Sequence, residues 1–334
     1  MSIVHCPLSI ENMVKEDNCN LNKININDTL PLVSILLAVY KPNKKWFIEQ
    51  LISLNNQSYK KLELIIYDDC PEFPVDKELF KKYITNFSYM LVRSNENKGS
   101  NKAFEYLTQL GKGKFFAYCD QDDIWEENKI EILVDLILSD KCVLAYSDMR
   151  VINSEGMILF DTLIEAKPRL KYVNGENLLS QLFFKNCISG CSMIIDSKIA
   201  KKAIPFSTYM IHDHWLSVIA SYYGGISFTK KTLVKYRIHD NNQTRSLSGI
   251  KNKEDYYNLR VRTLEYRLNE LKKCINVQSI DLKDIEDLCY SRINKNIFKI
   301  IKNRNLCKKE AYFEVVIKYM PNWLFERILN KLKY

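Results

Sequence analysis

Long hydrophobic runs are absent from this chain of 334 residues. No apolar stretch approaches the roughly 18–20 residues that a helix needs to cross a bilayer. The first 30 residues are polar and rich in asparagine, and they lack the basic start and apolar run of a signal or transit peptide. The sequence therefore predicts a cytoplasmic protein that is soluble, or at most peripheral at the inner face of a membrane.

Paired cysteines and glycine-rich phosphate loops are also missing. The ten cysteines include no C-x-x-C pair, and the closest two are Cys187 and Cys191. Without a secretory signal, they are expected to be reduced and mostly buried thiols rather than a disulfide framework. The chain has no G-x-G-x-x-G after its first predicted strand and no Walker-type G-x-x-x-x-G-K-[ST]. These absences argue against a dinucleotide-dependent oxidoreductase.

Charge is unevenly placed. The net charge is +9, and residues 251–334 hold 19 Lys and Arg against 11 Asp and Glu, which accounts for nearly the whole excess. Two interpretations stay open: a solvated helical surface, or a face that meets anionic lipid headgroups or a lipid-diphosphate acceptor. Nucleic acid is not expected as a partner, because no recognised binding motif accompanies the charge.

Strand and helix signals alternate from Leu32 to Asp148. Short apolar runs predict strands at 32–39, 62–67, 89–93, 115–119 and 142–147, with helical patterns between them. This alternation predicts βαβ units and an α/β fold with a mainly parallel sheet flanked by helices. Ligands of such sheets bind beyond the carboxyl ends of the strands, where Asp68 and Asp69 are expected to lie.

Three carboxylates follow the predicted strand 115–119 within four positions: Asp120, Asp122 and Asp123. Carboxylates this close repel one another unless solvent or a cation relieves them. Mg²⁺ or Mn²⁺ prefers such oxygen ligands, usually together with substrate phosphates. The end of a buried strand is therefore predicted to present a metal to a phosphorylated ligand. For Asp123 an alternative is the N-cap of a helix expected to begin around 124–126.

Five segments in order resemble the family 2 glycosyltransferases, the inverting enzymes with a GT-A fold, and especially their rhamnosyltransferase-like branch. The resemblance covers residues 32–244, about two thirds of the chain, and each segment alone would be weak. It implies a GT-A fold, with a Rossmann-like sheet and a helical C-terminal extension. The segments are VSILLAVYKPN (33–43), LELIIYDD (62–69), NENKGSNKAFEY (95–106), AYCDQDDIW (117–125), and IHDHWL (211–216) with YRIHDNNQT (236–244).

The resemblance places the nucleotide at the ends of the first strands. It implies that Ala38 and Tyr40 lie under the nucleotide, and that Asp69 accepts a hydrogen bond from the N3–H of uracil or thymine. An ionised carboxylate has only acceptors, so it suits this donor and disfavours cytosine. Gly99 and Lys102 match a segment near the nucleotide and its phosphates. From the residues alone, Asp69 remains open as a helix cap or Asx turn, and Gly99 with Lys102 as a solvated helix start.

The same resemblance assigns a metal and a base. Asp120-Gln121-Asp122 is similar to the D-x-D motif, which implies that Asp122 ligates the metal and that Asp120 lies near the ribose or the metal. His239 resembles a histidine that completes the metal or diphosphate site. Asp213 matches the catalytic base, which takes the proton of the acceptor hydroxyl. The alternative for Asp213 is a helix N-cap.

Some positions depart from the family pattern or stay unassigned. Lys41 and Pro71 replace polar residues, and Pro71 puts the pyrophosphate contacts of its loop in doubt. His212 stands where many relatives carry glutamate, and His214 receives no role. The segment 189–191 (Ser-Gly-Cys) resembles a small-residue loop near the acceptor.

The resemblance implies an inverting, metal-dependent hexosyltransferase. It would move rhamnose or another hexose from a dTDP- or UDP-sugar to a hydroxyl of a bacterial surface polysaccharide or lipid-linked glycan precursor. The alternative is a non-catalytic relative that binds a sugar nucleotide or glycolipid in a polysaccharide assembly complex. The expected regions are a polar segment (1–30), the GT-A domain (31–245) and a basic helical region (246–334). Within the domain, 31–148 would bind the nucleotide and 149–245 the acceptor.

Overall fold

The computed structural model describes residues 15–16, 30–240, 242, 249–276 and 282–333. The predicted polar segment 1–30 lies almost wholly outside the described residues, and so does the boundary expected at 245. Part of the motif 236–244 is outside them as well, since 241, 243 and 244 are not described.

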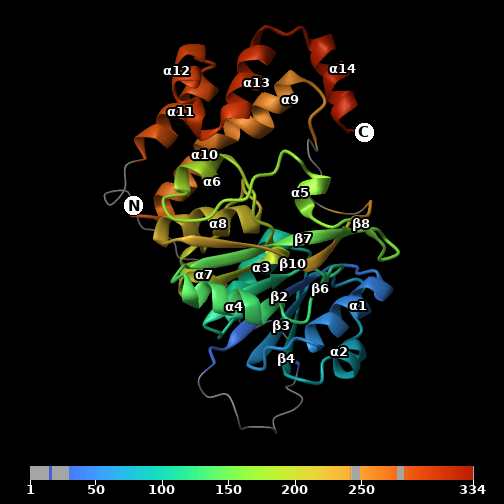
Figure 1. Cartoon of the computed structure of the whole chain (residues 1–334). Helices are drawn as coiled ribbons and strands as arrows, with labels where there is room; N and C mark the ends of the chain where they lie inside the picture. Colours follow the sequence, from blue (N-terminus) through green and yellow to red (C-terminus); the bar gives the residue numbers. More distant parts are fainter. Residues whose placement is uncertain (1–14, 17–29, 241, 243–248, 277–281, 334) are drawn as a thin grey trace.

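One ten-stranded sheet forms the centre of the molecule (Figure 1), in the order β1-β4-β3-β2-β5-β9-β7-β10-β6, with β8 paired to β7. Neighbours from β4 to β5 are parallel, β9 runs antiparallel between β5 and β7, and β10 is parallel to β7. The boundary expected at 148 falls inside β7. The strands are β1 (Lys15–Glu16), β2 (Val33–Val39), β3 (Leu62–Asp68), β4 (Ser88–Arg93), β5 (Phe115–Cys119), β6 (Ile124–Trp125), β7 (Leu144–Ile152), β8 (Ile158–Phe160), β9 (Met193–Asp196) and β10 (Ile226–Arg237).

Helices cover both faces of this sheet because its central strands are apolar on both sides. In β2, Ile35 and Leu37 join the apolar cluster made by α1, α2 and α4, whereas Leu36 joins the cluster made by α3, α6, α7 and α8. The predicted α/β fold with a mainly parallel sheet is confirmed. These helices are α1 (Lys44–Asn55), α2 (Lys77–Tyr83), α3 (Ser100–Leu110), α4 (Lys129–Ser139), α5 (Leu163–Ala166), α6 (Leu179–Phe184), α7 (Ser197–Lys202) and α8 (His212–Tyr223).

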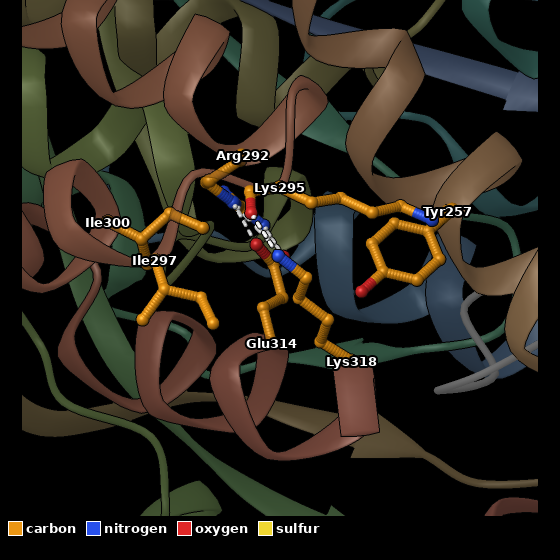
Figure 2. Close-up of a pocket in the computed structure, with 7 residues that line it drawn as sticks. All are labelled: Tyr257, Arg292, Lys295, Ile297, Ile300, Glu314 and Lys318. Atoms are coloured by element: carbon orange, nitrogen blue, oxygen red, sulfur yellow. Dashed lines mark hydrogen bonds and ion pairs between the residues drawn. The ribbon is translucent and has the colours of Figure 1, made fainter. Parts of the chain in front are cut away.

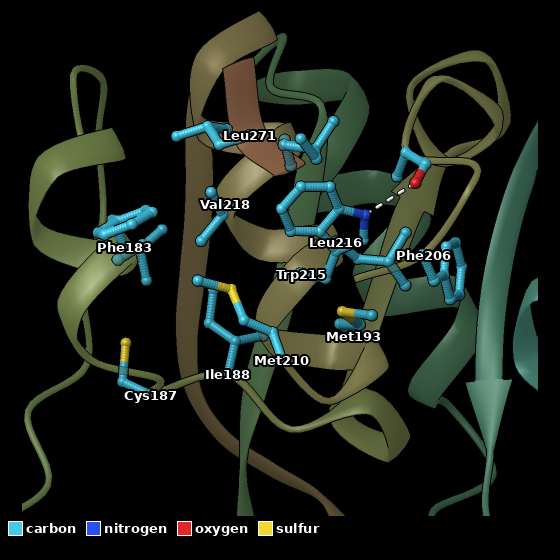
Figure 3. Close-up of a cluster of buried hydrophobic side chains, with 14 of the residues drawn as sticks. Phe183, Cys187, Ile188, Met193, Phe206, Met210, Trp215, Leu216, Val218 and Leu271 are labelled. Atoms are coloured by element: carbon cyan, nitrogen blue, oxygen red, sulfur yellow. Dashed lines mark hydrogen bonds between the residues drawn. The ribbon is translucent and has the colours of Figure 1, made fainter. Parts of the chain in front are cut away.

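Helix α8 is anchored by Trp215. This side chain is fully buried, and its indole N–H donates to the carbonyl oxygen of Ala203 at 2.7 Å. Met193, Phe206 and Met210 belong to the same buried apolar cluster (Figure 3). An indole that is both packed and hydrogen-bonded fixes its helix firmly, and the first turn of α8 carries Asp213.

The C-terminal region is helical, as predicted, and forms the end of the molecule opposite α1 and α2 (Figure 1). Leu268 and Leu271 of α10 join the cluster that includes α6 and α8, so this region shares the core of the sheet domain. Its helices are α9 (Lys253–Tyr256), a π-helical stretch (Tyr257–Arg262), α10 (Thr263–Cys274), α11 (Lys283–Ile293), α12 (Ile297–Lys302), α13 (Lys308–Tyr319) and α14 (Asn322–Lys333).

A buried ion pair joins α11 to α13. The guanidinium of Arg292 and the carboxylate of Glu314 approach to 2.6 Å, and their side chains are 5% and 1% exposed. The Tyr256 hydroxyl donates to the same carboxylate at 2.9 Å. Figure 2 shows the pair beside Lys295, which lies 3.8 Å from the ring centre of Tyr257. Because both charges are removed from water, each is tolerated in the core only while the opposite charge neutralises it.

Glu314→Gln should therefore lower the free energy of unfolding by about 3–5 kcal/mol, since it leaves the Arg292 charge buried without its counter-charge. Urea denaturation measures this. The matched control Glu78→Gln removes the exposed partner of Lys81 and should cost about 1 kcal/mol or less. Equal decreases in the free energy of unfolding for the two variants would show that the buried pair stabilises the fold no more than the exposed pair.

Candidate active site

Three adjacent parallel strands end at one edge of the sheet. The register pairs Val39 of β2 with Asp68 of β3, and Leu37 of β2 with Cys119 of β5. The residues that follow these strands are therefore brought together, as expected for the carboxyl edge of a parallel sheet.

Asp69 holds the start of α3. Its two carboxylate oxygens accept from the backbone N–H groups of Lys98 and Gly99, both at 2.8 Å. Burial raises the pKa of Asp69, although these two hydrogen bonds oppose the shift. The Asx turn considered for this position is made by Asp68, which accepts from the backbone N–H of Cys70 at 3.2 Å. Each oxygen of Asp69 keeps a second lone pair for a ligand.

The other residues predicted to contact the nucleotide are spread along this edge. Tyr40 is tied to the D-x-D segment, because Gln121 accepts from its backbone N–H at 2.8 Å and donates to its carbonyl oxygen at 3.0 Å. Ala38 lies in β2, two residues before Tyr40, and pairs with Tyr67 of β3. Lys102 forms an ion pair with Glu105 at 3.0 Å on the exposed side of α3. The reciprocal bonds of Gln121 were not expected from the sequence.

Asp122 and His239 meet across the site. A carboxylate oxygen of Asp122 lies 2.7 Å from Nε2 of His239, and the histidine ring lies 4.7 Å from that of Trp46. These residues are 117 positions apart in the sequence, and β10 delivers the histidine next to the end of β5. Asp120 lies beside them: burial raises its pKa well above the usual range, and Asp123, Asp122 and Asp213 add to the shift.

The helix-cap alternative for Asp123 is wrong. Residues Ile124–Trp125 form β6, which pairs with β10, and α4 begins only at Lys129. Pairing with β10 keeps the chain extended and delays the helix. Asp123 is buried instead: one oxygen accepts from the backbone N–H of Arg237 at 2.9 Å, and Oδ2 has no hydrogen-bond partner among the described residues.

Arg237 is a fully buried residue that the sequence interpretation missed, although it stands in the motif that gave His239. Its Nε donates to the carbonyl oxygen of Asp122 at 2.8 Å, and its terminal nitrogen meets the Glu49 carboxylate at 2.5 Å. It also donates to two carbonyl oxygens of the turn at 153–154, at 3.2 Å each. One side chain therefore fixes the acidic loop, α1 and the β7–β8 turn together.

Lys129 is a second buried cation at the site. Its ammonium donates to the carbonyl oxygen of Cys191 at 2.6 Å and lies 2.9 Å from the ring centre of Trp125. Burial lowers its pKa, against the attraction of Asp123 and Asp120. Donor atoms of Asp120, Asp123 and Cys191 all lie within 4.8 Å of one another. Burial raises the pKa of the Cys191 thiol, so this residue offers a neutral and soft sulfur.

The oxygen and nitrogen donors fit a hard divalent cation. Asp122 Oδ2 and His239 Nε2 lie 2.7 Å apart and share a hydrogen bond; both atoms can ligate one ion only if that ion replaces the shared proton. The crowded carboxylates and the unpartnered oxygen of Asp123 favour a positive charge here. A neutral thiol is a poor ligand for Mg²⁺, so Cys191 does not belong to this donor set.

Asp213 is held by side-chain and backbone donors. It is 8% exposed, and its oxygens accept from Asn186 Nδ2 at 3.0 Å and from the backbone N–H of Gly190 at 3.2 Å. The N-cap position of α8 is Ile211, so the capping alternative for Asp213 is wrong. Burial raises the pKa of Asp213 to about 6. The segment 189–191 thus contacts this carboxylate directly.

The two flanking histidines are buried and neutral. His214 Nε2 lies 2.6 Å from the carbonyl oxygen of Leu182, which ties α8 to α6. His212 packs on Phe104 with ring centres 4.0 Å apart, and burial lowers its pKa to about 3. A Cβ at Gly190 would lie 2.6 Å from His212 Nε2, so only glycine fits beside this ring.

Comparisons with known proteins agree on one family. Residues 34–201 match the family described as Glycosyl transferase family 2. An uncharacterized glycosyltransferase of Methanocaldococcus jannaschii is 30% identical over 239 residues, which cover 69% of this chain and 79% of the relative. The Escherichia coli UDP-Glc:alpha-D-GlcNAc-diphosphoundecaprenol beta-1,3-glucosyltransferase WfgD is 28% identical over 195 residues, covering 56% and 70%.

A solved structure shares the fold. S. aureus TarS 1-349, crystallised in complex with UDP-GlcNAc, matches with a TM-score of 0.56 and 15% identity, over 79% of this chain and 73% of TarS. At that identity the likeness concerns the fold alone. Within the described residues, no helix is long and apolar enough to cross a membrane.

The raised pKa of Asp213 predicts a pH-dependent cost to stability. The folded protein binds this proton more tightly than the unfolded chain, with a pKa of about 6 against 3.8. The protonated Asp213 carboxyl group therefore stabilises the folded protein at low pH, and this contribution is lost as the pH rises from about 4 through 6. Urea denaturation of Asp213→Asn should show its stability relative to wild type improving by on the order of 2 kcal/mol between about pH 4 and pH 7. Asp135→Asn on the exposed side of α4 should show no such trend; a flat difference for Asp213→Asn would refute the shift.

Proposed function

The chain belongs to glycosyl transferase family 2, and from this premise we propose that it transfers a sugar from a nucleotide-diphosphate donor to a hydroxyl group of a glycan acceptor. One observation carries the proposal. The backbone N–H of Gly190 donates to the buried carboxylate of Asp213 at 3.2 Å, and the next residue, Cys191, has its sulfur within 4.8 Å of carboxylate oxygens of Asp120 and Asp123. A proton acceptor therefore lies beside a site built for a charged phosphate and its counter-ion.

The donor is proposed to be a UDP- or dTDP-sugar. The edge formed by β2, β3 and β5 presents Asp69, whose remaining lone pairs suit the N3–H of uracil or thymine and repel the N3 acceptor of cytosine. Gly99, held against Asp69, lets the backbone approach a ligand closely because it has φ of +79° and no Cβ. TarS was crystallised with UDP-GlcNAc and with UDP, which supports a uridine donor. Ala38 and Tyr40 are proposed to lie under the nucleotide, and Lys102 near its phosphates.

Asp122, Asp120 and His239 are proposed to hold Mg²⁺ or Mn²⁺. When bound, such an ion offsets the negative charge that develops on the departing diphosphate. The chain contributes orientation: Arg237 holds the Asp122 carbonyl group, and the Arg237 backbone holds Asp123. Donors fixed in this way need little rearrangement when a ligand arrives.

Asp213 is proposed to be the general base. Ionised above a pKa of about 6, it accepts the proton of the acceptor hydroxyl as that oxygen bonds to the anomeric carbon. The bond from this carbon to the diphosphate oxygen breaks on the opposite face, so the configuration inverts. Asn186 and Gly190 hold the carboxylate in position. A module that only binds sugar nucleotides has no need of such a base, which disfavours the non-catalytic alternative.

The acceptor is proposed to be a lipid-linked glycan precursor of a bacterial surface polysaccharide. The name of WfgD describes a glucosyl transfer to a diphosphoundecaprenol-linked sugar, which supports this acceptor class. Rhamnose or another hexose is proposed as the transferred sugar. Pocket shape decides the sugar and linkage, and a few contacts change them.

Asp213→Asn should lower kcat by roughly 10²–10⁴-fold and leave UDP or dTDP binding intact, because only the proton acceptor is lost. Transfer from a panel of UDP- and dTDP-sugars, scored by nucleotide release, measures kcat. In wild type, kcat should rise with pH as Asp213, with a pKa of about 6, ionises. Retained turnover in the variant would refute Asp213 as the base.

Asp122→Ala should abolish metal-stimulated turnover and remove the effect of Mn²⁺ on nucleotide binding, because it deletes the central proposed ligand. Isothermal titration of UDP or dTDP, with and without Mn²⁺, measures the second effect without relying on activity. Asp135→Ala, on the exposed side of α4, is the matched control. Mn²⁺ that still tightens nucleotide binding in Asp122→Ala would overturn the ligand assignment.

A further inference from the structure

Large apolar side chains lie exposed on the three last helices. Their exposed fractions reach 88% for Phe298 on α12, 73% for Tyr319 on α13 and 64% for Trp323 on α14, and Tyr312 and Val316 are about half exposed. We call these five residues the outer surface. Residues 312, 316 and 319 are spaced by four and three positions, so they share one face of α13. Its opposite face buries residues 311, 314 and 317 in the protein.

The three helices form one packed unit. Ile300 of α12 and Ala311 of α13 belong to one apolar cluster, and the rings of Phe313 and Phe325 join α13 to α14 at 6.3 Å. The ammonium of Lys253 donates to the carbonyl oxygens of Ile317 and Met320, which fixes the corner between α13 and α14. The exposed side chains are thus carried on a fixed support at the end of the molecule opposite α1 and α2 (Figure 1).

The segment that carries this surface has an excess of positive charge. Residues 295–329 contain eight Lys and Arg and three Asp and Glu. Glu314 is buried with Arg292, so only Glu310 and Glu326 remain to offset the exterior charge. None of the eight basic side chains forms an ion pair with an acidic side chain of the described residues.

A second apolar surface lacks this charge. The hairpin formed by β7 and β8 exposes Met157, Ile158 and Leu159 at 62%, 53% and 49%. Residues 153–171 around it contain three basic and three acidic residues. The two surfaces are similar in apolar character and differ in charge, so the hairpin serves as an internal comparison.

We propose that the outer surface binds an anionic lipid bilayer. Exposed Trp, Tyr and Phe on a segment whose Lys and Arg lack acidic partners suit the level of the headgroups, where rings bury their apolar faces and cations meet lipid phosphates. Val316 adds an aliphatic side chain, which a lipid surface accepts and a stacked nucleobase does not require. The proposal rests on the proposed function only in naming the benefit: the site is brought to an acceptor held in the membrane.

The test is co-sedimentation of the full chain with vesicles of phosphatidylcholine alone or with added phosphatidylglycerol. Wild type should bind only the anionic vesicles, and high salt should weaken binding. The triple variant with Val316→Ser, Tyr319→Ser and Trp323→Ser should lower the partition coefficient about tenfold or more, through lost apolar burial. Lys308→Gln with Lys309→Gln should weaken binding less and flatten its salt dependence.

Matched controls separate the alternatives. The variants Ile52→Ser, at an exposed position of α1, and Ile158→Ser, on the hairpin, should bind vesicles as wild type does. No wild-type binding to anionic vesicles, or an equal loss in Ile158→Ser, would overturn the proposal. The proposal would also be overturned if wild type formed a dimer that the triple substitution dissociates while vesicle binding stays unchanged. Preferential binding of wild type to single-stranded nucleic acid over anionic vesicles would overturn it as well. UDP or dTDP binding in the triple variant reports folding and the donor site, so a failed donor assignment is distinguishable from a failed membrane surface.

Discussion

Crowding of carboxylates at the carboxyl edge of the sheet is the constraint on which the rest of this structure depends. Asp120, Asp122 and Asp123 would repel one another and unfold the loop after β5 if nothing opposed them. Buried Lys129 of α4 opposes their charge, and Arg237 of β10 fixes the loop through the carbonyl oxygen of Asp122 and, by its backbone N–H, the carboxylate of Asp123. Burial, and then the neighbouring carboxylates, still hold the pKa of Asp120 well above its usual range. The remaining negative potential favours a divalent cation, and the charge of that cation would in turn attract a diphosphate.

The C-terminal helices support the same site indirectly, because α10 is hydrogen-bonded to the loop that precedes α8. Glu270 of α10 accepts from the backbone N–H of Thr208 at 3.1 Å and from the hydroxyl of Ser207. Asn101 of α3 donates to the carbonyl oxygen of Met210 at 2.7 Å. Asp213 follows this loop directly, so α3 and α10 both set its position. The C-terminal region therefore serves the candidate active site as well as the proposed membrane contact.

The sequence predicted features that depend on local pattern and order. Alternating strand and helix patterns predicted the α/β sheet, and the acidic residues after the strands predicted the sheet edge at which the candidate site lies. Features that depend on distant pairing were missed. The helix-cap alternative for Asp123 fails because nothing local in the sequence indicates that β6 pairs with β10. The bonds of Arg237 to Glu49, 188 positions away, and of Gln121 to Tyr40 required the fold itself.

A crystal structure of the chain with UDP and Mn²⁺, with the ion located by its anomalous signal, tests the central claim most directly. The account predicts the ion at Asp122, the uracil N3–H at Asp69, and the Asp213 carboxylate facing the diphosphate end of the nucleotide. A nucleotide bound away from the ends of β2, β3 and β5, or an ion held without Asp122, would contradict it.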